Sequence, residues 1–369
     1  MLIDKIKEKG KEIYQRFLSK KTKAIILNIN IQNKIVKVMT CDSKDYSSIV
    51  INTKRYEFPD FSDAYYEMLV NMVVETEYYK NYKDETSLYI SLPNEYFTYD
   101  LIEIPTVKKH IMNDSLEIKK IDSYKHKNEL LTRSCLIHSN KKISTYLVRV
   151  VKKELIKKLY SIFSDIGMYP KGVTIASNSL ISGISHFDSK LFNQSYLFLD
   201  IKDNYSIITI SDKGKCSGYY YLGFGENILN STKLEAESKI FNHDFSEKVI
   251  LESEAKAKGL DISSMKSSFI NSNDEIKNKD QGLDYLEENF KIFLKWIALV
   301  KRSYENNGSD FLIDNVYINM PIKYHDLLAK VDMNIVPFSH NLGIPEEYLY
   351  SLDMYGVLYP NKITKQDYL

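Results

Sequence analysis

The sequence predicts an α/β protein of two lobes, with a small α/β unit inserted in the first. Its length of 369 residues exceeds what a single hydrophobic core usually supports. Apolar residues make up 44% and charged residues 27% of the chain, as is typical of a soluble globular protein. Segments 23–40 and 196–210 both have the β-branched pattern of a hairpin, and each opens one half of the chain.

Charge and cysteine content exclude several classes of protein. A net charge of +1, from 50 basic and 49 acidic side chains, argues against a nucleic-acid binder. Cys41, Cys135 and Cys216 are widely spaced, so neither a disulfide framework nor a zinc site is indicated, and a reducing compartment is expected. No segment has 18 uninterrupted apolar residues, and the N-terminus lacks the pattern of a signal peptide. We therefore expect a cytoplasmic protein.

Residues 1–23 have the pattern of a basic amphipathic helix. Such a helix can make a weak contact with an anionic membrane surface or with a partner. It can equally be a solvated helix laid against the core, and Gly10 in its middle weakens both interpretations.

The first lobe is expected to open with three strands, a helix and a further strand. A turn near Gln32 and Asn33 separates the first two strands, Ser62 is a plausible helix N-cap, and Pro93 ends the last strand. In chain order, the segments are two strands in 23–40, a strand in 47–58, a helix at 60–82 and a strand at 87–93.

The inserted unit is expected between about residues 98 and 173. Its last helix is strongly amphipathic and is closed by Gly167. In chain order, its segments are a strand at 98–105, a helix at 106–122, strands at 130–139 and 143–151, the helix at 152–167 and a strand that begins at 172.

The second half repeats the opening hairpin and then becomes helical. A turn at Asp212, Lys213 and Gly214 leads to a third strand. The remaining segments are a strand at 216–224, a helical stretch at 226–240, a polar stretch at 242–280, a helix at 282–306 that carries Trp296, and a strand at 314–321.

Six phrases in this order resemble the actin-like ATPase superfamily, and within it the PilM family of type IV pilus assembly. FtsA, a cell-division relative, is the next most similar. The resemblance covers about residues 24–360. It rests on the order of these segments and on their hydrophobic patterns more than on invariant residues. The phrases are NIQNKIVKV (30–38), YISLPNEYFTYDLIEIP (89–105), YLVRVVKKELIKKLYSIFSDIGMYPKGV (146–173), LDIKDNYSIITI (199–210), GFGENI (223–228) and SEAKAKG (253–259).

The resemblance implies an actin-like two-lobe fold of ribonuclease H-like repeats with a small inserted α/β subdomain in the first lobe. The implied divisions are the basic helix 1–23, a first lobe of 24–97 and 174–195, the insert 98–173, a second lobe of 196–345 with a smaller subdomain at about 227–285, and a C-terminal return at 346–369.

The resemblance also implies a nucleotide site, from which key residues are missing. Family members clasp the phosphates with a glycine-bearing hairpin turn from each lobe, because backbone N–H groups must approach the oxygens closely. Gln32 and Lys202 stand at those glycine positions, Asn30 replaces an aspartate that would help to hold Mg²⁺, and Asp200 is retained. The implied nucleotide-binding positions are Asn30, Gln32, Lys37, Asp200, Lys202, Asn204, Gly223 and Gly225.

Lys202 has two interpretations, a phosphate partner or a surface lysine at a turn, and the sequence favours the second. The late strand, which should end in a Gly-Gly corner under the adenine, instead offers Asn319, Met320 and Pro321. We therefore expect the hairpin to keep the shape of a nucleotide site without binding the nucleotide tightly. We expect no catalytic residue, no metal and no cofactor. Binding of Mg-ATP is the alternative.

In the PilM family, the groove between the first lobe and its insert receives the N-terminal cytoplasmic tail of PilN, a single-span membrane protein. An extended apolar peptide can bind there through main-chain hydrogen bonds and side-chain pockets. The residues expected to line the groove are Tyr96, Tyr99, Leu101, Ile102, Leu155, Leu159 and Tyr160, with Leu155 and Leu159 open to a plain core role.

The predicted function is therefore a pseudo-ATPase scaffold of type IV pilus assembly, peripheral at the inner face of the membrane, that binds a PilN-like tail. The alternatives are an actin-like switch that binds ATP and an FtsA-like division scaffold. A homo-oligomer formed through the lobes is also expected, without a residue-level argument.

Overall fold

The computed structural model describes residues 23–42, 45–106, 129–139, 141–231, 284–306, 313, 315–331, 333–338, 349 and 351–360. The expected basic helix at 1–23, the helix at 106–122 and the polar stretch at 242–280 lie almost wholly outside these residues. The chain divides within one helix, α6 (Ala176–Phe187), into a first unit that ends at Ser179 and a second unit of Leu180–Thr364.

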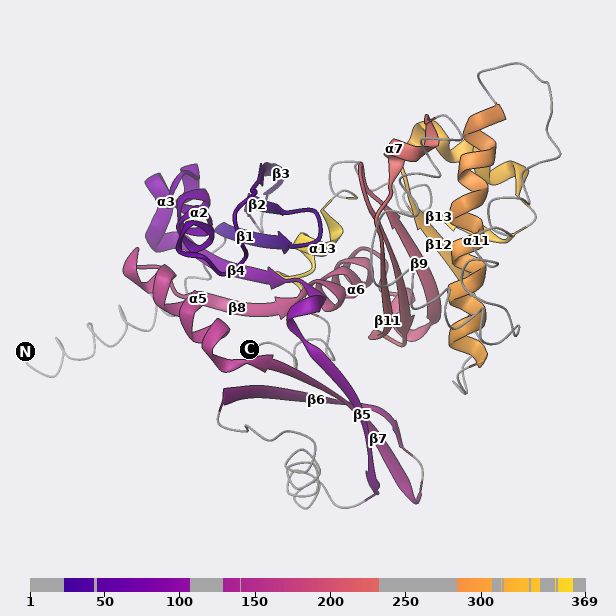
Figure 1. The fold of residues 1–369 in the computed structure, drawn as a ribbon, viewed down its shortest axis with the longest axis horizontal. Helices are drawn as coiled ribbons and strands as arrows, with labels where there is room; N and C mark the ends of the chain where they lie inside the picture. The colour runs from indigo at the N-terminus through magenta and orange to yellow at the C-terminus, as the bar shows by residue number, and fades with distance from the viewer. Residues whose placement is uncertain are drawn as a thin grey trace, which may run out of the picture. The chain divides into compact units, whose positions relative to one another are not determined.

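The first unit is built on a mixed five-stranded sheet of order β3-β2-β1-β4-β8 (Figure 1). The first three strands are antiparallel, as the hairpin pattern predicts, whereas β4 and β8 run parallel to β1. The strands are β1 (Lys23–Asn30), β2 (Ile35–Asp42), β3 (Asp45–Arg55), β4 (Thr86–Leu92) and β8 (Pro170–Ile175).

The segment expected as one helix at 60–82 forms two, α2 (Asp63–Val74) and α3 (Glu77–Tyr82). Ser62 caps α2, as predicted, by accepting from the Tyr65 N–H. Thr76 is extended and its hydroxyl accepts from the Tyr79 N–H, so it ends one helix and caps the next. The prediction of a single helix was wrong because a local side-chain cap competed with an otherwise continuous helical pattern.

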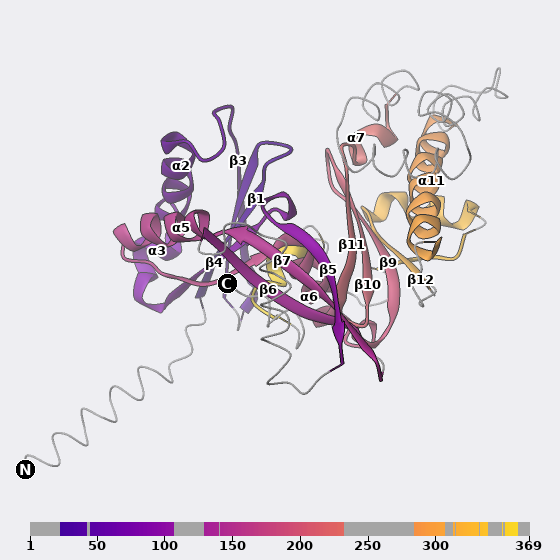
Figure 2. The same cartoon turned by 60° about the horizontal axis from the view of Figure 1, so that its bottom comes forward.

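The inserted unit is a three-stranded antiparallel sheet of order β5-β7-β6, brought forward in Figure 2. Its strands are β5 (Thr98–Pro105), β6 (Leu130–Ser139) and β7 (Ile143–Lys152). Helix α5 (Lys153–Asp165) follows β7 directly, and Gly167 closes it with a positive φ of 70°. Phe163 and Leu159 of α5 are buried in the core of the first lobe.

The second unit repeats the first sheet with the order β11-β10-β9-β12-β13. Again three antiparallel strands are followed by two that run parallel to the first of them. Lys213 and Gly214 both have positive φ at the predicted turn between β10 and β11, as a type I′ hairpin requires. The strands are β9 (Ser195–Ile201), β10 (Ser206–Asp212), β11 (Lys215–Leu222), β12 (Asn315–Asn319) and β13 (Ile335–Pro337).

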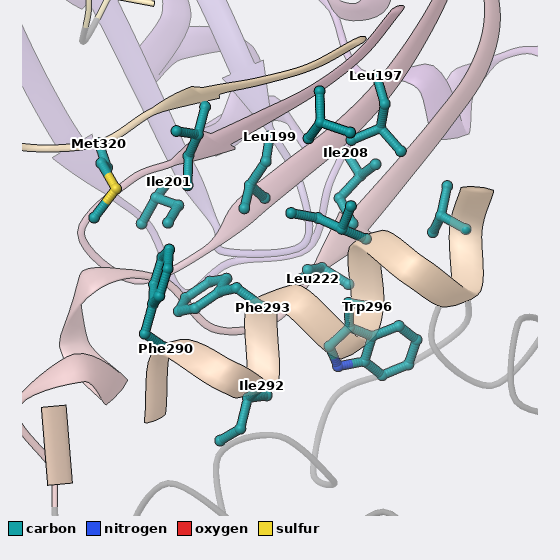
Figure 3. Close-up of a cluster of buried hydrophobic side chains, with 14 of the residues drawn as sticks. Leu197, Leu199, Ile201, Ile208, Leu222, Phe290, Ile292, Phe293, Trp296 and Met320 are labelled. Carbon is teal, nitrogen blue, oxygen red and sulfur yellow. The ribbon is translucent and has the colours of Figure 1, made fainter. Parts of the chain in front are cut away.

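Helix α11 (Asp284–Asn306) packs on one face of this second sheet (Figure 3). Trp296 and Phe293 are fully buried there against alternate residues of β9, namely Leu197, Leu199 and Ile201. The intervening residues of β9 face a second core that includes Leu180 and Ile184 of α6. The short elements of this unit are α7 (Glu226–Leu229), η5 (Ile322–Lys330) and α13 (Leu352–Tyr355).

The identical order and direction of strands in the two sheets confirm the predicted α/β class and its internal repeat. β13, η5 and α13 have no counterpart in the sequence prediction, because each is short and lacks a clear period. Among the helices that the structure describes, none is both long and apolar enough to cross a membrane.

Candidate functional site

The second-lobe hairpin joins β9 to β10 and carries the predicted residues Asp200, Lys202 and Asn204. Along β9, Tyr196 and Phe198 face the α6 side of the sheet, and the alternation of a strand directs Asp200 to the same side. Asp200 is fully buried and Lys202 is 3% exposed, whereas Asn204 lies exposed at the tip of the turn.

Lys202 forms a buried ion pair with Asp200. Its Nζ lies 2.9 Å from Asp200 Oδ2. The interpretation of Lys202 as a surface lysine is therefore wrong. The local sequence DIKDNY is typical of a solvated turn, and residues far along the chain contribute to the burial of the lysine.

Three of these distant residues complete the cluster. Asn319, at the end of β12, donates its Nδ2 to Asp200 Oδ1 and to the Leu349 carbonyl, at 2.8 Å in each case. The same carbonyl lies 3.5 Å from Lys202 Nζ. Asp353 of α13 is 6% exposed and acts electrostatically on both members of the ion pair. We name these five residues, Asp200, Lys202, Asn319, Leu349 and Asp353, the lysine cluster.

The lysine cluster holds two carboxylates and one ammonium. Burial alone would lower the pKa of Lys202, but Asp200 and Asp353 raise it above its ordinary value. Burial raises the pKa of Asp200, an effect that the Lys202 ammonium opposes and the Asp353 carboxylate reinforces.

Gly225 closes the corner against the hairpin. A Cβ on Gly225 would lie 2.0 Å from the Lys202 carbonyl oxygen and 2.7 Å from the backbone of Tyr205. The glycine is needed here for the close contact between two backbones. Gly223, two residues earlier, is buried in the same corner.

Four backbone N–H groups of this corner are bonded within the protein. The Lys202 N–H donates to the Tyr205 carbonyl, and the N–H groups of Glu226 and Asn227 donate to the carbonyls of Lys202 and Asp203. The Gly225 N–H donates to the Asn227 side chain at 3.0 Å. A phosphate cradle needs such groups to point at the ligand. The N–H groups of Lys202, Gly225, Glu226 and Asn227 are therefore not available to a phosphate.

The first-lobe hairpin, between β1 and β2, is bonded in a different way. Asn30 accepts from the Asn33 N–H at 3.0 Å and so caps its own turn. Gln32 is exposed and donates to Glu95 at 2.6 Å. Lys34 has a positive φ of 52° and pairs with Asp60 at 2.8 Å. Lys37 is half-buried on β2, opposite Asn28 of β1.

Five of the seven residues expected to line a peptide groove lie in two hydrophobic clusters of the first unit. Tyr96, Leu155 and Tyr160 are partly buried against the core of the first lobe, in which Leu159 is 1% exposed. Ile102 is buried in the separate core of the inserted sheet. The structure describes the strand position of Tyr99 and Leu101, in β5, and not their side chains.

Tyr96 belongs to an aromatic group at the rim of the first lobe. Its hydroxyl lies 3.2 Å from that of Tyr65, and its ring centroid lies 4.9 Å from that of Phe61. Phe61 is 47% exposed, and burial raises the pKa of Tyr96. Tyr160 and Leu155 of α5 are partly exposed apolar residues that pack against the same core.

The described residues that could bind a metal ion or act as nucleophiles do not form a reactive group. Among the described residues, no three His, Cys, Asp or Glu side chains gather as a metal site would require. Cys41 and Cys216 are free and buried, and burial raises the pKa of the Cys41 thiol to about 12. A thiol with so high a pKa is a poor nucleophile at neutral pH.

The fold agrees with that of a known protein across nearly the whole chain. A chain of the PilM–PilN type IV pilus biogenesis complex superposes with a TM-score of 0.51 at 10% identity, covering 91% of this chain and 96% of that one. The chain has an actin-like fold. The predicted PilM-like, two-lobe architecture is thereby confirmed, and identity this low shows the fold alone.

Two further structures match with lower scores. One is a Bacteroides thetaiotaomicron protein with an actin-like ATPase fold and unknown function, with a TM-score of 0.38 at 10% identity, covering 91% of this chain and 98% of that one. The other is the cytoplasmic domain of EpsL, an inner-membrane component of the type II secretion system of Vibrio cholerae, with a TM-score of 0.35 at 10% identity over 58% of this chain and 74% of that one. No protein-family model and no curated protein sequence matches the chain.

Proposed function

We propose that this actin-like protein is a scaffold of a type IV pilus-like assembly system, located in the cytoplasm at the inner face of the membrane, and that it binds the N-terminal tail of a PilN-like membrane protein. The observation that carries the proposal is the likeness to a chain of the PilM–PilN complex over 91% of this chain. Scaffolds of this kind act by presenting a fixed surface to an extended peptide.

The state of the second-lobe hairpin supports a scaffold over a nucleotide switch. A switch requires groups that are free to meet a ligand and that change partners when it leaves. Asp200 is paired with Lys202, and the N–H groups of the Gly225 corner are bonded to backbone or side-chain oxygens. The proposed function therefore needs no nucleotide for the protein to adopt its binding-competent form.

The proposed partner surface is the aromatic rim of the first lobe together with the exposed side of α5. Tyr160 is half-buried on this helix, so part of its ring is accessible to a partner. An apolar side chain of a bound peptide would extend this contact and remove the rest of the ring from water.

The test is calorimetric titration of the full chain with a synthetic peptide of the N-terminal cytoplasmic tail of a PilN-like protein from the same organism. We expect a Kd in the micromolar range, and a Tyr160→Ser variant that binds at least tenfold more weakly. Tyr169→Ser is the matched control, because Tyr169 lies just beyond α5 and is 70% exposed. Absence of binding heat with the wild-type chain would contradict the proposed partner. An equal loss of affinity in both variants would contradict the proposed binding site.

A further inference from the structure

The lysine cluster has the donor chemistry of a metal site, with an ammonium at its centre. Asp200 places a carboxylate oxygen 2.9 Å from Lys202 Nζ, and Leu349 places a carbonyl oxygen 3.5 Å from it. The buried carboxylate of Asp353 acts on the lysine electrostatically. Oxygen sets of this kind are what Mg²⁺ and Ca²⁺ prefer. The structure supplies the positive charge from within the chain, as Lys202 Nζ.

Burial explains why a cation is needed at this position. Asp200 is fully buried and Asp353 is 6% exposed, so neither carboxylate is solvated well enough to stand alone. Lys202, at 3% exposure, neutralises one of the two charges.

The cluster also ties together segments that are far apart in the sequence. Lys202 and the Leu349 carbonyl are separated by 147 residues, and Asn319 and Asp200 by 119. The contacts join the ends of β9 and β12 to the C-terminal segment that carries α13. A cation at the centre therefore holds the end of the second unit on its sheet.

We infer that Lys202 is the permanent, covalently tethered cation of this cluster, in the place where a divalent metal ion would otherwise be needed to hold the C-terminal segment on the sheet. The consequence is that the wild-type protein needs no metal here, and that removal of the lysine creates a divalent-cation site. This inference concerns the second unit alone and does not depend on the proposed PilN-like partner.

The test compares thermal unfolding of the full chain with and without 10 mM MgCl₂ or CaCl₂, at matched ionic strength. We expect the Tm of the wild type to change by less than about 1 °C beyond the effect of ionic strength. Lys202→Ala should lower the Tm by roughly 10 °C without metal, because it leaves a buried carboxylate uncompensated. Added Mg²⁺ or Ca²⁺ should then recover several degrees, since an ion that binds only the folded state stabilises it.

Two controls separate a cation site from a general effect of charge. Asp200→Asn with Lys202→Ala should show no response to metal, because the principal ligand is gone. Lys323→Ala removes an exposed lysine of the same unit that pairs with Glu226 at 2.5 Å, and it should leave both the Tm and the absence of a metal response unchanged.

The outcomes are distinct. A metal response in Lys202→Ala alone supports the inference, whereas the same response in the wild type, or none in a folded Lys202→Ala, would overturn it. If Lys202→Ala does not fold, the double variant Asp200→Asn with Lys202→Met, which removes both charges, tests the inference. If the double variant folds, the missing charge explains the failure of Lys202→Ala. If it does not fold, Lys202 acts through packing, contrary to the inference.

Discussion

The two hairpins that open the lobes have the same connectivity and opposite environments. In the first, Gln32 is exposed and Lys34 is 40% exposed in its ion pair with Asp60, so the turn is largely solvated. In the second, Asp200 and Lys202 are buried and bonded to chain segments from the far end of the unit. A repeated architecture thus conserves strand order while the polar residues of its turns acquire different roles.

The comparison also indicates that lysines at two similar turns can contribute very differently to stability. A surface ion pair gains little, because water solvates both charges nearly as well as they solvate each other. A buried pair is costly to break, because its remaining member has no solvent. The predictions below test this contrast, from the largest expected effect to the smallest.

Replacing one lysine from each hairpin gives the sharpest contrast. Lys202→Met should lower the free energy of unfolding of the second unit by about 3–5 kcal/mol, because Asp200 loses its buried partner. Lys34→Met should cost about 0.5 kcal/mol, as expected for an exposed pair. Urea unfolding followed by the fluorescence of Trp296, the single tryptophan of the chain, reports on the core between α11 and the second sheet. Equal losses of unfolding free energy in the two variants would contradict the proposed difference between the two hairpins.

The closed corner at Gly225 predicts the next largest effect. Gly225→Ala should cost about 1–3 kcal/mol or more, since its Cβ would overlap the Lys202 carbonyl and the turn must move. The same unfolding measurement applies. A stable Gly225→Ala protein would mean that the corner can open without loss, and would favour a site able to admit a ligand.

Alkaline pH should weaken the second unit through Lys202. Because the pKa of Lys202 is raised above 10.5 in the folded state, its contribution is complete below that pH and is lost as pH rises toward the folded value. The slope is at most about 1.4 kcal/mol per pH unit. The double variant Asp200→Asn with Lys202→Met should lack this loss of stability at alkaline pH. An unchanged pH dependence in the double variant would contradict its assignment to Lys202.

The smallest effect is expected in the first hairpin. Gln32→Ala removes an exposed hydrogen bond to Glu95 and should cost about 0.5 kcal/mol or less. Thermal unfolding of the variant is a sufficient measurement. A loss of several degrees in Tm would show that this turn, too, is a structural element.

Much of the fold was predictable because its signals are local. The β-branched runs gave the strands of both hairpins, Ser62 gave the start of α2, and the positive φ of Lys213 and Gly214 realises the predicted turn. The one helix predicted over 60–82 is interrupted at Thr76, where a capping hydroxyl outweighs helical periodicity.

The lysine cluster could not be predicted in the same way. Lys202 reads as a turn lysine within its own segment, and its partners Asn319, Leu349 and Asp353 lie more than a hundred residues later. Asn319 was recognised only as a departure from a Gly-Gly corner. Its amide is what holds Asp200 to the Leu349 carbonyl. Tertiary burial of polar residues is set by such distant segments, which no local pattern records.

The most direct test of the account is calorimetric titration of the wild-type chain with Mg-ATP, with Asp200→Asn as the control. The account predicts no heat of binding and no thermal shift at millimolar Mg-ATP, because the hairpin is closed by Lys202 and its own backbone. Micromolar binding that is lost in Asp200→Asn would contradict it, and would identify the protein as a nucleotide-dependent switch.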